Sequence, residues 1–212
     1  NGDSYLSLAK IQVYYQRLNE VLKVPANVFN KGNWTINLKY KAHQGIDDIW
    51  YRVLWDCTID SGNWYQVGFA NSTGKLRLAA ICDGNFVDLK SDVILSAGTT
   101  YDITATGDGE NLKLYVDGVQ VGLTTPYAEP VGNLPDYMHI GGQPAHYANG
   151  IIDEFRIDKI ARTDAEIADW YNANEPSTPD EYTTYLSHFD GSLSSEKLPY
   201  ACWESAPKDV SQ

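Results

Sequence analysis

The chain has 212 residues, which is enough for one large domain. Its 16 Lys and Arg against 28 Asp and Glu give a formal net charge of −12, so nucleic acid and anionic membrane surfaces would be repelled. Aromatic residues make up 12 % of the chain, too many for a disordered protein, and no apolar stretch approaches the roughly 18 to 20 residues of a membrane span. We expect a folded acidic domain with no nucleic-acid partner and no membrane insertion.

The first candidate element covers residues 11–22. Its apolar residues recur at the spacing of one helix face, namely Ile11, Tyr15, Leu18 and Leu22. This spacing predicts a short helix, although the β-branched and aromatic content of the segment disfavours one.

From residue 33 onward apolar and polar residues alternate, which is typical of antiparallel strands. Turns rich in Gly, Asp and Asn separate runs that each have the length of a strand. The predicted apolar faces consist of Trp34, Ile36, Leu38 and Tyr40; of Tyr51, Val53 and Trp55; of Tyr65, Val67 and Phe69; and of Leu76, Leu78 and Ala80.

The segment 111–121 predicts a tight hairpin, because Asp117-Gly118 separates two alternating runs and both central positions of such a turn need positive φ. A short helix is predicted over 164–172, where Thr163 and Glu166 have the spacing of a capping box. Strands at this spacing predict an all-β fold, a two-sheet antiparallel jelly-roll sandwich with one or two short helices.

The C-terminal part divides into a linker and a further strand. Residues 175–181 (EPSTPDE) contain two prolines and no apolar periodicity, so they are predicted to be a linker that leaves the domain formed by residues 1–174. Residues 182–193 alternate again and turn at Asp190-Gly191. A strand at this point needs a sheet to join, so the segment 182–212 is expected to complete the same domain or a neighbouring subunit.

The three cysteines lie far apart in the sequence, without the close pairs of a zinc site. Buried free thiols are favoured for Cys57, Cys82 and Cys202, and one disulfide with one free thiol is the alternative.

Several blocks together resemble the laminin G-like, concanavalin A-like lectin jelly-roll superfamily. They are Asn1–Leu8 (NGDSYLSL), Gly32–Leu38 (GNWTINL), Asn111–Gly118 (NLKLYVDG) and His139–Asp158 (HIGGQPAHYANGIIDEFRID), followed by Ala161–Ile167 (ARTDAEI). The family's usual first strand, of the HFDG type, is displaced here to Leu186–Ser192 (LSHFDGS) at the opposite end.

Three explanations cover this displacement: a cut from a tandem array, a circular permutation, or a strand donated to the next subunit. In the third, Tyr185, Leu186, Phe189 and Asp190 would fill a neighbour's sheet edge, and repetition would build a homo-polymer.

The resemblance also implies a structural calcium ion between the aspartates that match the HFDG-like and GxIDE-like strands, here Asp190 and Asp153. The alternative is that Asp190 shapes a turn and Asp153 accepts backbone hydrogen bonds.

Catalysis is not expected. Laminarinase-type relatives place paired carboxylates on one face of a strand, whereas strict alternation over 152–156 puts Asp153 on the face of Phe155 and Glu154 on the face of Ile152 and Arg156. The four histidines show no metal-ligand spacing.

Glycan binding is the family's commonest non-catalytic use of the fold, and it needs an outward aromatic ring with polar neighbours. Trp50 and Trp64 alternate out of phase with the apolar faces and are the platform candidates, with packing between covered faces as the alternative. Weaker candidates in predicted loops are Asn85, Gln143, His146 and Tyr147.

The sequence therefore favours a non-catalytic carbohydrate-binding or adhesion module that works in the extracellular space, on a cell surface or on a virion, with a glycan as partner. The alternative is a self-assembling structural subunit of a filament, surface layer or virion.

Overall fold

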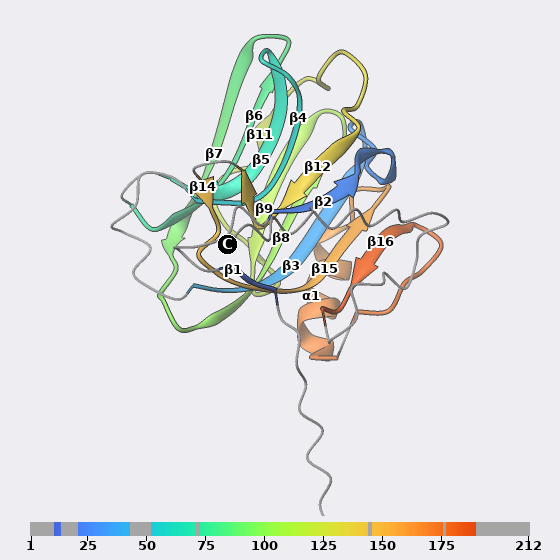
Figure 1. Cartoon of the computed structure of the whole chain (residues 1–212). Helices are drawn as coiled ribbons and strands as arrows, with labels where there is room; N and C mark the ends of the chain where they lie inside the picture. The colour runs from blue at the N-terminus through green and yellow to red at the C-terminus, as the bar shows by residue number, and fades with distance from the viewer. Residues whose placement is uncertain are drawn as a thin grey trace, which may run out of the picture.

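The computed structural model describes residues 11–13, 21–42, 52–70, 73–143, 146–175 and 177–189. Antiparallel strands dominate this part of the chain (Figure 1), which contains one α-helix, α1 (Asp164–Ala173), and one 3-10 helix, η1 (Ala26–Val28). The predicted all-β sandwich is confirmed. Neither helix is long and apolar enough to cross a membrane.

The strands form two large sheets and one small one. The eight-stranded sheet has the order β1-β15-β3-β8-β9-β10, with β11 paired to β9 and β16 to β15. Its strands are β1 (Ile11–Val13), β3 (Trp34–Ala42), β8 (Thr100–Gly107), β9 (Asn111–Val116), β10 (Val119–Gln120), β11 (Thr125–Pro126), β15 (Gly150–Asp158) and β16 (Thr183–Ser187).

The six-stranded sheet has the order β2-β12-β4-β5-β6-β7. Its strands are β2 (Leu22–Pro25), β4 (Arg52–Asp60), β5 (Asn63–Phe69), β6 (Lys75–Cys82), β7 (Asn85–Ile94) and β12 (Tyr137–Ile140), and the small sheet pairs β13 (Gly142–Gln143) with β14 (His146–Tyr147).

The core lies between the two large sheets, because every second side chain along each strand points inward. At its centre, four aromatic rings pack with centroids 5.3 to 6.0 Å apart in the contacting pairs; they belong to Phe29, Trp34, Trp55 and Tyr65. Cys57 and Cys82 are buried free thiols, and burial raises their pKa to about 12 and about 11, respectively. Cys202 lies outside the described residues.

The hairpin between β9 and β10 has the predicted turn. Asp117 and Gly118 both have positive φ, at 51° and 76°. A Cβ on Gly118 would lie 2.9 Å from the Cβ of Tyr171, so glycine also allows the turn to approach α1 closely.

Helix α1 begins as predicted, because the Thr163 hydroxyl accepts the N–H of Glu166 and the Glu166 carboxylate accepts the N–H of Thr163. The helix predicted over 11–22 is wrong where the structure describes that segment. Ile11–Val13 and the residues from Leu22 onward are strands, since an apolar spacing with β-branched residues also fits a sheet.

A bulge in β15 overturns the alternation assumed for 152–156. The register with β3 shifts between Asp153 and Arg156, and Glu154 has a φ of 53°. As a result Phe155 shares the core face with Ile152, while Asp153 and Arg156 belong to the opposite face.

Both ends of the described chain lie along one edge of β15 (Figure 1). Strand β1 pairs with residues 150–152, and β16 pairs with residues 155–158. Tyr185, Leu186 and Phe189 are buried in this single chain, and Asp190 lies outside the described residues. Since the pairing needs no neighbour, homo-polymerisation through a donated strand gains no support.

A buried ionic network fastens α1 and the segment 177–183 to β15. Asp158, fully buried, accepts hydrogen bonds from Arg156 (2.9 Å) and Arg162 (2.7 Å). Arg162 also donates to Asp180 at 2.6 Å, and although burial opposes it, this contact holds the pKa of Asp180 at about 2. Two residues of the segment predicted to be a linker, Thr178 and Asp180, are thus bonded to the arginines of this network.

We expect Asp158→Ala to lower the free energy of unfolding by about 3–5 kcal/mol, because it leaves two buried guanidinium groups without their shared carboxylate. Lys90→Ala is the control: its ammonium lies 2.9 Å from Asp88 but is half exposed, so the loss should stay below about 1 kcal/mol. Urea unfolding measures both, and equal losses would contradict the role given to Asp158.

Candidate functional site

One row of side chains crosses the outer face of the six-stranded sheet. Thr58 lies opposite Trp64, Trp64 opposite Ile81, and Ile81 opposite Phe86. His139 on β12 pairs with Asp56 on β4. Tyr137 lies two residues before His139 and Thr58 two residues after Asp56, so the antiparallel register places Tyr137 beside Thr58 and continues the row. We call Tyr137, Thr58, Trp64, Ile81 and Phe86 the aromatic row.

The aromatic row is open to solvent. Phe86 is 53 % exposed, Tyr137 is 46 % exposed, and Trp64 is half-buried. The rings of Trp64 and Phe86 lie 6.2 Å apart with their planes tilted by 58°. Trp64 thus points outward as predicted, while Tyr65 behind it is in the core.

Charged groups border the aromatic row on β6 and β7. The Arg77 guanidinium lies 5.2 Å from the centroid of Phe86 and 2.6 Å from the Asp88 carboxylate. Asn85, a predicted candidate, is exposed, but it is the register partner of the core residue Cys82, so alternation directs it away from the face that carries Phe86. The Phe86 ring therefore carries a guanidinium and a carboxylate beside it at this end of the row.

The remaining predicted glycan-binding residues do not join the aromatic row. Gln143, His146 and Tyr147 belong to the β13–β14 hairpin, whose preceding residue Gly141 donates its N–H to Leu54 at the far end of β4. Trp50 lies outside the described residues.

Of the two predicted calcium ligands, Asp153 is the one that lies among the described residues, at the β15 bulge. Asp153 accepts the N–H of Glu154 at 3.1 Å, and Glu154 pairs with His188 at 2.7 Å. Among the described residues, no group of three or more His, Cys, Asp or Glu side chains is placed to hold a metal ion. Asp190 lies beyond them.

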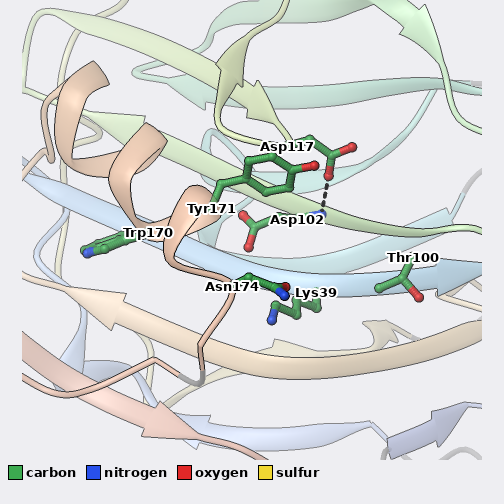
Figure 2. A pocket seen from close by; sticks show the side chains of 7 residues that line it. All are labelled: Lys39, Thr100, Asp102, Asp117, Trp170, Tyr171 and Asn174. Atoms are coloured by element: carbon green, nitrogen blue, oxygen red, sulfur yellow. Dashed lines mark hydrogen bonds between the residues drawn. The ribbon is translucent and has the colours of Figure 1, made fainter.

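A separate pocket of about 270 Å³ lies on the other side of the sandwich, where α1 covers the outer face of the eight-stranded sheet (Figure 2). Helix α1 contributes its last turn and the residue after it, and β3, β8 and the β9–β10 turn contribute the floor. The lining residues are Lys39, Thr100, Asp102, Asp117, Trp170, Tyr171 and Asn174.

Asp102 is the most perturbed group in this pocket. Burial raises its pKa from 3.8 to about 6, against the opposing effects of a hydrogen bond from Asn37 and the charge of Lys39. Asn37 donates to Asp102 Oδ1 at 2.6 Å, and Asp102 donates its backbone N–H to the carboxylate of Asp117 at 2.9 Å. A carboxylate is therefore held ionised near neutral pH in a place that disfavours its charge.

Sequence reasoning missed Phe86, Tyr137 and the whole pocket. The alternation of Phe86, Asp88 and Lys90 could have placed Phe86 on an outward face, but its position beside Trp64 depends on strand register. The pocket joins two strands and a turn to a helix, and no local pattern encodes that arrangement.

We expect Asp102→Asn to stabilise the fold at pH 7.5 by an amount on the order of 1 to 3 kcal/mol. Because the folded-state pKa is raised, the folded protein binds a proton between about pH 4 and pH 6 that the unfolded chain lacks, so wild-type stability falls as pH rises through this window. The advantage of the variant should vanish below about pH 4. Urea unfolding at both pH values is the measurement, and a variant less stable than wild type at pH 7.5 would contradict the account.

Solved structures share this fold at low identity. Domain 4 of AbnA, an extracellular arabinanase of Geobacillus stearothermophilus solved with arabinotriose, is 17 % identical, with a TM-score of 0.62 over 70 % of this chain and 71 % of that one. The SAP-like pentraxin of Limulus polyphemus is 13 % identical, with a TM-score of 0.59 over 86 % of this chain and 92 % of that one.

No curated protein sequence matches the chain significantly. The sequence profile of the concanavalin A-like lectin/glucanases superfamily matches residues 18–168, which is most of the chain. The match includes β3, the β9–β10 hairpin and β15, the same elements that form the sandwich. The chain belongs to the concanavalin A-like lectin/glucanase superfamily.

Proposed function

We propose that the chain is a non-catalytic carbohydrate-binding module that recognises a polysaccharide outside a cell or on a virion surface. The observation that carries the proposal is the aromatic row, with Trp64, Phe86 and Tyr137 presented on the outer face of one sheet. Exposed apolar side chains gathered in this way mark a binding surface rather than a core.

The chemistry of the row suits sugars. A sugar ring has an apolar face that stacks on an aromatic ring and hydroxyl groups that hydrogen-bond to charged and amide side chains. The aromatic residues occur on β12, β5 and β7, every second strand, and neighbouring strands are about 4.8 Å apart. A row of this kind favours an extended ligand that crosses the strands.

The fold relatives are consistent with this function. Domain 4 of the Geobacillus arabinanase was solved with arabinotriose, and that domain has the same fold as this chain. Arabinan is therefore a sensible first ligand to test. The extracellular arabinanase also supports a location outside the cell.

The surroundings of the two acidic residues at the bulge favour binding over catalysis. The carboxylate of Glu154 pairs with His188 and accepts the backbone N–H of Ser177, so the fold already uses it. The bulge places Asp153 on the sheet face that carries Arg156. Neither arrangement resembles a nucleophile and an acid facing one cleft.

A structural calcium ion is part of the proposal. Ca²⁺ takes six to eight oxygen ligands, and the described residues offer only Asp153 at the expected place, so Asp190 and backbone carbonyl groups would have to complete the shell.

We expect Trp64→Ala and Phe86→Ala each to weaken polysaccharide binding about tenfold, equivalent to about 1.4 kcal/mol, because each removes a stacking surface. Affinity gel electrophoresis with arabinan, xylan, mixed-linkage β-glucan and polygalacturonan measures this. Both side chains are at the surface, so the fold should persist.

Leu123→Ala is the matched control, since Leu123 is 83 % exposed and lies outside the row. It should bind like the wild type. Failure of all four polysaccharides to retard the wild-type protein would overturn the proposed function, and release of reducing ends from any of them would overturn its non-catalytic character.

If calcium is bound, the melting temperature should rise on adding millimolar CaCl₂ and fall in EGTA, because an ion that binds only the folded state stabilises it. Asp153→Asn should abolish most of this response. A wild-type melting temperature identical in CaCl₂ and EGTA would remove calcium from the proposal.

A further inference from the structure

The pocket beneath α1 is made by parts of the chain far apart in sequence. Lys39 and Asp102 are register partners on β3 and β8, and Asp117 follows β9. Tyr171 and Asn174 come from the end of α1, where Asn174 adopts a left-handed conformation. Figure 2 shows these side chains around one space.

The charges in the pocket select against anions. Asp102 and Asp117 bring two carboxylates, and the carbonyl end of α1 adds partial negative charge, which would repel an anion. The ammonium of Lys39, the register partner of Asp102, offsets one of the two carboxylate charges. A neutral ligand with both donors and acceptors can pair with the carboxylates and with the ammonium at the same time.

Hydrogen-bonding capacity is left over in the pocket. Asp102 Oδ1 is used by Asn37, and one carboxylate oxygen of Asp117 is used by the Asp102 N–H, which leaves the second oxygen of each carboxylate available. Among the described residues, none forms a hydrogen bond or an ion pair with the Lys39 ammonium. A hydroxyl group that donates to Asp102 and accepts from Lys39 satisfies both partners.

An aromatic wall completes the set. Tyr171 is 44 % exposed at the pocket. The face of Trp170 is occupied by Arg156, whose guanidinium lies 4.2 Å from the ring centroid, so Tyr171 is the ring offered to a ligand. The volume of about 270 Å³ is just below the roughly 300 Å³ at which sites for drug-sized ligands begin, and suits one small ring.

We propose that this pocket is a second sugar site, separate from the aromatic row, that takes a single neutral sugar residue through Lys39, Asp102, Asp117 and Tyr171. The two sites lie on the outer faces of different sheets. Sugar binding in the pocket does not require the aromatic row to bind, so either proposal can fail alone.

The test is a titration of the ¹⁵N-labelled protein with methyl glycosides of glucose, galactose, mannose, N-acetylglucosamine, fucose and arabinose, followed by NMR. We expect at least one glycoside to shift the Trp170 indole N–H and the Gly118 amide with saturation at millimolar concentration. Lys39→Met and Asp102→Asn should each weaken this binding at least tenfold.

Two controls separate the sites. Lys41→Met changes the next outward lysine on β3, which does not line the pocket, and should bind like the wild type. Trp64→Ala should also leave the pocket shifts unchanged.

The proposal is overturned if none of the six glycosides shifts the pocket resonances, or if Lys39→Met and Asp102→Asn bind as tightly as the wild type. Shifts that disappear in Trp64→Ala and persist in Lys39→Met would also overturn it, because they assign the sugar to the aromatic row and leave the proposed function standing.

Discussion

The position of α1, and with it one whole face of the molecule, depends on the buried carboxylate of Asp158. Two arginines share this carboxylate, one from β15 and one from the loop before the helix. A buried charge is costly unless it is paired and hydrogen-bonded, so the helix can dock only where both guanidinium groups reach Asp158. Trp170 then packs against both arginines, at 4.2 and 5.1 Å.

The polar contacts of Asp158, Arg156 and Arg162, which we call the polar seam, have a consequence for how the helix packs. Ile167 is the fully buried residue of α1, and the helix is also held to the sheet by the hydrogen bonds of Asp164 with Lys113 and Tyr115 and by the contact of Trp170 with Arg156. Directional contacts fix a position without filling space, whereas an apolar interface closes to high density. The pocket lies at the end of this seam, where the last turn of α1 passes over Lys39 and Asp102.

Local chemistry in the sequence predicted the local features well. Alternation placed Trp64 on an outward face, Asp117-Gly118 formed its predicted turn, and Thr163 and Glu166 formed their capping box. Each of these depends on a few neighbouring residues. Alternation and turn spacing also predicted the two-sheet sandwich, and the family resemblance supported it.

The errors share a physical cause. Alternation over 152–156 failed because Glu154 enters a left-handed conformation, and one extra residue in a strand exchanges the two faces beyond it. The aromatic row and the pocket depend on which strands are neighbours, as with Trp64 and Phe86. Such pairing is set by the whole sheet, so a single sequence shows the side chains without showing that they meet.

The raised pKa of the Asp102 carboxyl group bears on whether this residue has a structural or a functional role. Burial raises the pKa of Asp102 to about 6 and so disfavours its ionised form at neutral pH, while Asn37 donates a hydrogen bond to it and Lys39 lies opposite it on β3. Groups held at such a cost cluster at functional sites.

The two proposed sites also face away from each other, one on each sheet, with the core between them. A single stiff polysaccharide that lies along the aromatic row does not reach the pocket. Simultaneous occupation would therefore join two glycans through one module rather than raise the affinity for one glycan.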